Sequence, residues 1–214
     1  MNSHRSLIRR VAAASVAVTA ALVLAACGGG DGDGDGATNG SHDKPSATAS
    51  AGSPDGQGGH NAADVSFAQG MIPHHRQAVE MADLAATRAS SAEVKKLAAE
   101  IKKAQDPEIR TMSGWLRGWG EDVPAEDAGM DHSGHHGMPG MMTPADMTKL
   151  EKASGKAFDT AFLELMIKHH EGAVEMARTE RSKGSDAAAK ALAEEIITSQ
   201  SAEITRMNTL LGRD

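Results

Sequence analysis

The chain has 214 residues and only one cysteine, Cys27, so an intramolecular disulfide is excluded. Basic residues are too few to balance the acidic ones: 22 Lys and Arg stand against 29 Asp and Glu. This balance argues against nucleic acid as a partner and favours cations. Long stretches of period-two alternation are also missing, which argues against β-strands and for an all-helical domain.

A long hydrophobic run is absent as well. The apolar stretch 11–26 follows three arginines and is too short and too rich in alanine for a permanent membrane span. We therefore predict a signal peptide at 1–26. The stretch ends in Leu-Ala-Ala before Cys27, which resembles the lipobox of bacterial lipoproteins and implies lipidation of that cysteine. We expect an exported cell-envelope protein, lipid-anchored to the outer face of the cytoplasmic membrane; the alternative is an ordinary cleaved secretory signal.

Residues 27–61 are rich in Gly, Asp, Ser, Ala and Pro and show no apolar periodicity, so a disordered, flexible tether is predicted there. Without the signal peptide, 19 Lys and Arg face 29 Asp and Glu, a balance of about −10. Residues 62–214 are long enough for one domain with its own core.

Two stretches of this domain are near copies of each other. Residues 71–82 read MIPHHRQAVEMA and residues 166–177 read MIKHHEGAVEMA. Pairing residue n with n+95 from Phe67/Phe162 to Leu116/Leu211 needs no gap and gives 22 identities in 50 pairs. This repeat predicts a duplicated helical hairpin.

Apolar residues at three-to-four-residue spacing predict helices at about 63–88, 91–118, 144–154, 157–183 and 186–211. Ser90 with Glu93 forms a capping-box pattern, and Thr143-Pro144 is typical of a helix start. Two antiparallel hairpins then pack as a ferritin-like four-helix bundle. The first hairpin, the connector and the second hairpin are predicted at 62–120, 121–143 and 144–214.

Each copy places two histidines and two methionines on one face of its helix. The candidate metal ligands are Met71, His74, His75, Met81, Met166, His169, His170 and Met176. Thioether sulfur suits Cu(I), imidazole suits copper, zinc and nickel, and a site without cysteine suits an oxidising envelope. Copper, with Cu(I) favoured, is the best match, and zinc or nickel stays possible. The alternative is that the methionines fill the core and the histidines are hydrogen-bonded there.

Polar residues of the second helix of each hairpin are placed level with the histidines. Gln105 and Glu108 recur as Gln200 and Glu203, and we predict that they orient the imidazole rings. An exposed polar position is the alternative reading for all four.

The connector holds a third cluster of histidine and methionine, spaced by glycine: Met130, His132, His135, His136, Met138, Met141 and Met142. A flexible segment of this composition cannot pack as a core, so we predict secondary metal capture that passes copper inward. An unselected low-complexity linker is the alternative.

The pattern around Asp64 and the first His-His motif, repeated around Asp159, resembles the DUF305 family from about 64 to 211. That resemblance implies a ferritin-like helical bundle, and some members are periplasmic copper-binding proteins linked to copper tolerance. It implies copper ligation by the His and Met residues of both motifs. Lys168 stands where the first copy has Pro73, so the two sites need not be equivalent.

We therefore expect a copper-binding lipoprotein for sequestration, tolerance or delivery, with no catalytic turnover. Its partners would be the metal ion, the membrane and a metal-delivery protein or a second copy of the chain, with no nucleic acid. One alternative is an envelope module for structure or protein docking. Another is a di-iron oxidase, but the required Glu-x-x-His spacing is absent from both motifs, which have Met or Ile three residues before each histidine.

Overall fold

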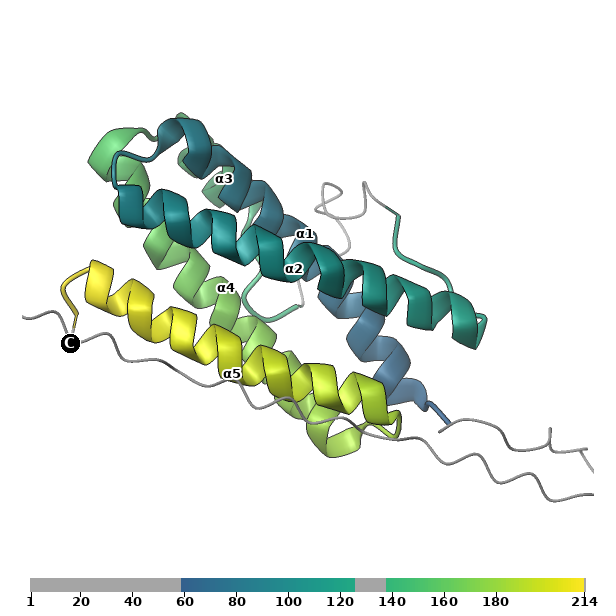
Figure 1. Ribbon diagram of the computed structural model, residues 1–214. Helices are drawn as coiled ribbons and strands as arrows, with labels where there is room; N and C mark the ends of the chain where they lie inside the picture. The colour runs from purple at the N-terminus through teal and green to yellow at the C-terminus, as the bar shows by residue number, and fades with distance from the viewer. Residues whose placement is uncertain (1–58, 126–137, 214) are drawn as a thin grey trace, which may run out of the picture. The chain divides into compact units, whose positions relative to one another are not determined.

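The computed structural model describes residues 59–125 and 138–213. Its elements are, in chain order, α1 (Ala62–Arg88), α2 (Ala92–Trp119), α3 (Pro144–Lys152), α4 (Gly155–Lys183) and α5 (Ala187–Leu210) (Figure 1). Within these two ranges the β contacts amount to an isolated bridge between Ala89 and Gly155. The predicted all-α fold is confirmed.

The five helices form two hairpins that pack on each other. In Figure 1, α2 lies along α1 and α5 lies along α4, while α1 also packs on α4. The helices α1 and α4 are antiparallel, because the Asn61 side chain at the start of α1 donates to the carbonyl of Lys183 at the end of α4, at 2.9 Å. The short α3 contacts both of these helices. The bundle of two duplicated hairpins is therefore confirmed.

The repeat extends to the way the helices begin. The Asp64 carboxylate of α1 accepts the backbone N–H groups of residues 185 and 186, just before α5, at 3.1 and 3.0 Å. Its counterpart Asp159 of α4 accepts those of residues 90 and 91, just before α2, both at 3.0 Å. Each hairpin thus holds the start of the other hairpin's second helix, which ties the two halves together.

The predicted start of α2 is wrong by one residue. The N-cap is Ser91, whose hydroxyl accepts the N–H of Val94 at 3.3 Å. The hydroxyl of Ser90 donates to Asp159 instead, a partner that local sequence does not reveal. The predicted start at Thr143-Pro144 is confirmed, with a capping box between Thr143 and Asp146.

Two apolar clusters fill the bundle. One gathers around Leu97, Phe158 and Phe162, and the other around Phe67 and Ile196. The His-His motifs lie near the middle of α1 and α4, in the same helices that supply both clusters. Polar rings in such a place require partners, because burying an unpaired polar group is costly.

In the part of the chain that the structure describes, no helix has the length and apolar character needed to cross a bilayer. The predicted signal peptide, Cys27 and most of the predicted tether lie outside the described residues, as do Met130, His132, His135 and His136.

Candidate metal centre

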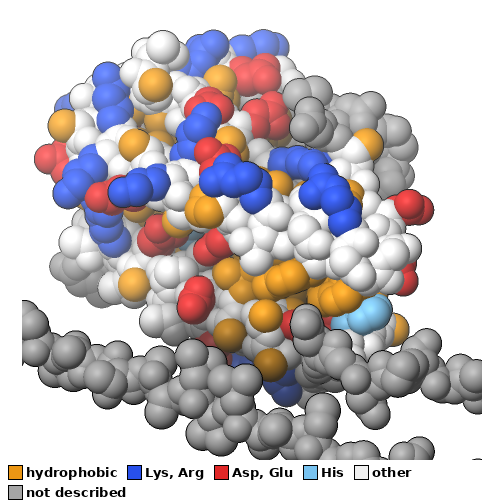
Figure 2. Space-filling view, turned by 45° about the vertical axis from the view of Figure 1, so that its right-hand side comes forward, with side chains coloured by type: hydrophobic (Ala, Val, Ile, Leu, Met, Phe, Trp, Pro, Cys, Tyr) orange, Lys and Arg blue, Asp and Glu red, His pale blue; other side chains and the backbone are white. Residues whose placement is uncertain are grey.

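Four histidines are completely buried in the bundle: His74, His75, His169 and His170 each have 0% exposed surface. Figure 2 shows a face on which basic and acidic side chains are interspersed and histidine covers little of the surface. Adjacent residues of a helix point about 100° apart. The two histidines of each motif therefore reach different neighbours, and the four rings form one central pair and two outer contacts.

The central pair joins the two hairpins. The rings of His74 and His169 have centroids 3.8 Å apart at an interplanar angle of 44°. Nε2 of His74 lies 3.1 Å from the carbonyl oxygen of Pro139. A carbonyl only accepts, so this nitrogen carries the proton and Nδ1 keeps its lone pair. That Nδ1 and both ring nitrogens of His169 are buried without a hydrogen-bond partner.

The outer contacts repeat with the same geometry. His75 of α1 contacts Glu108 of α2, and His170 of α4 contacts Glu203 of α5, each with Nε2 2.7 Å from Oε2. In both rings Nδ1 is buried and lacks a partner. A carboxylate that holds one ring nitrogen fixes the tautomer and raises the basicity of the other, as it does for metal-bound histidines. The predicted orienting role of the two glutamates is thus met.

The same role predicted for Gln105 and Gln200 is not met. Their side-chain oxygens are buried without a hydrogen-bond partner, and so are the four Nδ1 atoms. Antiparallel pairing of the helices brings the glutamines level with the histidines along the bundle axis. It does not orient their amide groups toward the imidazole rings. They add buried acceptors instead.

Burial keeps the central rings neutral. It lowers the pKa of His74 to about 3, with the neighbouring His75 adding to the effect. Burial likewise lowers the pKa of His169 well below the ordinary value for histidine. A neutral imidazole offers a lone pair to a metal ion, whereas an unpaired buried acceptor costs about 1–3 kcal/mol in its absence. The nitrogen atoms at the centre are therefore suited to bind a metal ion.

The geometry also limits how an ion binds. With metal–nitrogen bonds of about 2.0 Å, two imidazoles on one ion have ring centres roughly 5–6 Å apart. An ion shared by His74 and His169 therefore requires the rings to separate from their present 3.8 Å. In the described ranges no three His, Cys, Asp or Glu side chains form a group that could hold a metal ion. Thioethers are the further ligands that the two motifs offer.

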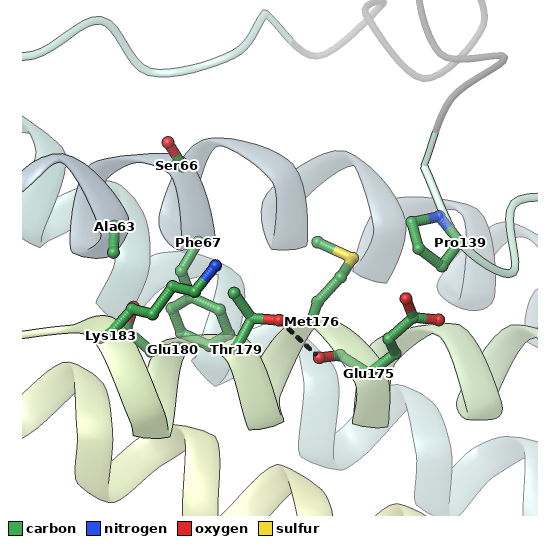
Figure 3. Close-up of a pocket in the computed structure, with 9 residues that line it drawn as sticks. All are labelled: Ala63, Ser66, Phe67, Pro139, Glu175, Met176, Thr179, Glu180 and Lys183. Carbon is green, nitrogen blue, oxygen red and sulfur yellow. Dashed lines mark hydrogen bonds between the residues drawn. The ribbon is translucent and has the colours of Figure 1, made fainter.

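The methionines of the two motifs occupy unlike places. Met71, Met81 and Met166 are completely buried in the apolar clusters. Met176, the counterpart of Met81, is partly exposed and lines a pocket of about 400 Å³ (Figure 3). Ligation by these four residues stays a prediction.

The end of the connector is a packed part of the site. The Gln77 amide donates to the carbonyl of Met142 at 3.0 Å and accepts its N–H at 2.7 Å. Gly140 has φ +77°, and a Cβ at Gly172 would lie 2.1 Å from the carbonyl oxygen of Pro139. The prediction that the connector cannot pack is therefore wrong for residues 138–142. Met142 is buried in the core, and Met138 and Met141 are partly exposed.

Sequence analysis missed Pro139, Gln77 and Gly172 as site residues. Gln77 and Gly172 are counterparts in the repeat, and they are among the few positions where the two motifs differ. That difference was the available signal, because it coincides with contacts made by the connector. The carbonyl of Pro139 carried no signal, since every residue has one.

Comparison with solved structures gives close likenesses. A DUF305 protein from Streptomyces coelicolor is 39% identical with a TM-score of 0.63, and the match covers 70% of this chain and 92% of that one. CopM in its Cu(II)-bound form is 38% identical with a TM-score of 0.60, covering 69% and 94%. CopM also has Cu(I)-bound, Ag-bound and apo structures that match. Comparison with curated proteins gives no match.

The DUF305 sequence profile, described as a domain of unknown function, matches residues 64–211. This range contains both hairpins, the four buried histidines and the connector. The chain therefore belongs to the DUF305 family.

Proposed function

We propose that this protein binds copper through the buried histidines of its bundle and sequesters or hands on the ion without catalysing a reaction. The main support is the set of buried imidazole nitrogens that lack a hydrogen-bond partner. Two of the rings are oriented by carboxylates in the manner of metal-bound histidines. The likeness to CopM, which has been solved with Cu(I), Cu(II) and silver, points to the same metal.

The residues have distinct roles in this proposal. His74 and His169 supply nitrogen ligands between the hairpins, and His75 and His170 supply one within each hairpin. Met71, Met81, Met166 and Met176 supply thioethers, whose softness favours Cu(I) over zinc or nickel. Each of these roles is ligation of the ion itself, so we propose storage or transfer of the ion and that the protein is not an enzyme.

We further propose that the protein is exported and anchored by a lipid on Cys27. The lipobox-like sequence supports this, and the Streptomyces relative is described as a candidate secreted protein. Membrane fractions of cells that make the protein should contain it, and Cys27→Ser should release it. If the variant and the parent fractionate alike, the anchor proposal is wrong.

Copper binding is tested by titrating the protein with Cu(I) against a chromophoric chelator. A variant with His74, His75, His169 and His170 all changed to alanine should lose at least about 100-fold in affinity, since even residues that only orient ligands contribute 10–100-fold. His60→Ala is the matched control, because His60 is exposed and stacks on Trp119 at 4.7 Å, away from the buried rings. Circular dichroism checks that each variant is helical.

The outcomes separate the candidate functions. Tight binding that the fourfold variant retains would move the site to the methionines or the connector. A parent protein that binds Cu(I) no better than micromolar would contradict the proposal and leave a structural or docking module of the envelope as the better reading.

A further inference from the structure

We propose that Met138 and Met176 form a second, outer site for a soft monovalent ion, Cu(I) or Ag(I), against Gly70 of α1. The inference rests on the proposed function only in taking copper as the ion that continues to the histidines. It places Met176 of α4, counted above among the thioether ligands, at this outer site together with Met138 of the connector. Met71, Met81 and Met166 are left to the buried histidines.

Both thioethers converge on one glycine. A Cβ added to Gly70 would lie 2.9 Å from Cε of Met176 and 3.6 Å from Sδ of Met138. The backbone at Gly70 is ordinary helix, so its φ does not demand glycine. Glycine inside a helix costs about 0.5–1 kcal/mol relative to alanine. The structure shows what that residue provides, which is room for two methionine side chains.

The second hairpin has no such room at the equivalent position. The counterpart of Gly70 is Leu165, whose side chain is partly buried against the core. Within residues 59–125 and 138–213 this room therefore exists once, on the side where residues 138–142 cross the bundle.

The two methionines differ from the core methionines in exposure. Met138 and Met176 are partly exposed, whereas Met81 and Met207 are completely buried. Figure 3 shows the Met176 thioether at the pocket between α1 and α4, with Pro139 and the Glu175 carboxylate beside it. An ion from solvent can reach this sulfur, and the nearby carboxylate favours a cation.

The outer site adjoins the central histidines. Gly70 precedes His74 by four residues, about one helical turn or 6 Å along the axis. Met138 directly precedes Pro139, whose carbonyl accepts from Nε2 of His74 at 3.1 Å. Close packing of Gly140 on α4 holds this segment in place. An ion held by the thioethers is therefore next to the buried pair, and the outer site is the entrance to it.

The ligands predict the selectivity. Two neutral thioethers suit Cu(I) and Ag(I) and bind Zn(II) poorly, whereas imidazoles accept all of these metals. A soft monovalent ion therefore binds at the outer site before it reaches the histidines. The histidines by themselves discriminate less between metal ions.

Methyl NMR of the protein labelled with ¹³C at the methionine methyl groups tests this directly. The chain has 12 methionines. Titration with Ag(I) should shift the methyl signals of Met138 and Met176, and Zn(II) should leave both in place. Met138→Leu and Met176→Leu assign the signals and remove the sulfur at nearly constant volume. Met207→Leu, in the core, should leave Ag(I) binding unchanged.

Gly70→Leu gives the first hairpin the residue of the second and should abolish the Ag(I)-dependent shifts of both methyl groups. Gly114→Leu is its control, because a Cβ at Gly114 meets no atom within 4 Å. A parent protein that binds no Ag(I) would overturn the proposed function and this inference together. Ag(I) binding that is lost in the fourfold histidine variant, but leaves Met138 and Met176 unshifted and is unaffected by their change to leucine, would overturn the inference alone.

Discussion

The two hairpins agree where they hold histidines and differ where they meet the connector. His75 and Glu108 make the same 2.7 Å contact as His170 and Glu203. In contrast, Gln77, which binds the Met142 backbone, has Gly172 as its counterpart. The repeated positions carry candidate ligands, and the unrepeated ones place the connector. In this duplicated domain, the differences between the copies show where the connector is held.

A second difference lies at the far end of α4. The first hairpin has Ala85 and Ala89, where the second has Glu180 and Gly184. A Cβ at Gly184 would lie 2.1 Å from Oε1 of Glu180, so glycine makes room for that carboxyl group. Burial and the adjacent Asp64 raise the pKa of Glu180 to about 8.

The partner carboxyl group shifts in the opposite direction. Burial alone would raise the pKa of Asp64, but the neighbouring Glu180 carboxyl group and the backbone N–H groups of residues 61, 185 and 186 outweigh it and lower the pKa to about 2. At neutral pH the two groups therefore share one proton, which Glu180 carries.

The largest expected effect on Cu(I) affinity comes from breaking the central pair of His74 and His169. If His74 and His169 bind one ion together, His74→Ala and His169→Ala should each weaken Cu(I) binding at that site by more than about 100-fold, and the double variant should add little. His75→Ala with His170→Ala, on separate hairpins, should be additive. Chelator competition measures all of these. Additive losses from His74→Ala and His169→Ala would mean that each ring binds its own ion.

A smaller loss of Cu(I) affinity should follow from removing the carboxylates that contact His75 and His170. Glu108→Gln and Glu203→Gln keep the shape but weaken the hold on Nε2, so each should lower Cu(I) affinity by about 10–100-fold. The equal distances in the structure predict equal losses. Unequal losses, measured in the same competition assay, would show that differences between the two copies, such as Pro73 against Lys168, affect the outer sites.

The free energy of unfolding should depend on the contacts of the connector. Gln77→Ala leaves the buried N–H and carbonyl of Met142 without their partner and should lower the free energy of unfolding by about 1–3 kcal/mol. Gly172→Ala should cost a similar amount, because its Cβ overlaps the backbone of Pro139. Gly118→Ala, with open space around its Cβ, is the control. Denaturant unfolding gives the values, and equal stability of all variants would show that the segment is not held by these contacts.

A further expected effect is a pH dependence of the stability that is specific to the second hairpin. The folded state keeps the Glu180 proton up to about pH 8, whereas the unfolded chain releases it near its ordinary pKa of about 4.3. Between these values the folded state binds more protons, so stability should fall as the pH rises. Asp64 acts in the opposite sense, but only below about pH 4.

Glu180→Gln should remove most of this slope. Its melting temperature should match that of the parent near pH 5 and exceed it at pH 8.5, while the exposed control Glu121→Gln should follow the parent throughout. A parent melting temperature that stays constant from pH 5 to 8.5 would contradict the shared proton.

The contacts between histidines and carboxylates in the candidate site could be predicted from local patterns in the sequence. The period of 3.6 places residues of one helix, and short turns place Glu108 beside the first motif, so the carboxylate contact of His75 was predictable. The Pro139 carbonyl was not, because it lies 65 residues from His74 in the chain and its chemistry is that of any backbone. The N-cap of α2 is Ser91 and not the predicted Ser90 for a similar reason, since the distant Asp159 binds Ser90.

The sequence by itself determined the helices, their duplication and the ligand types, because helical periodicity and side-chain chemistry are local properties. Only the tertiary structure decided that the adjacent His74 and His75 face different partners, or that Met81 is core while its counterpart Met176 lines a pocket. The physical reason is that exposure and pairing depend on which distant segment covers each helix face, and here one connector covers one side of a nearly symmetric bundle.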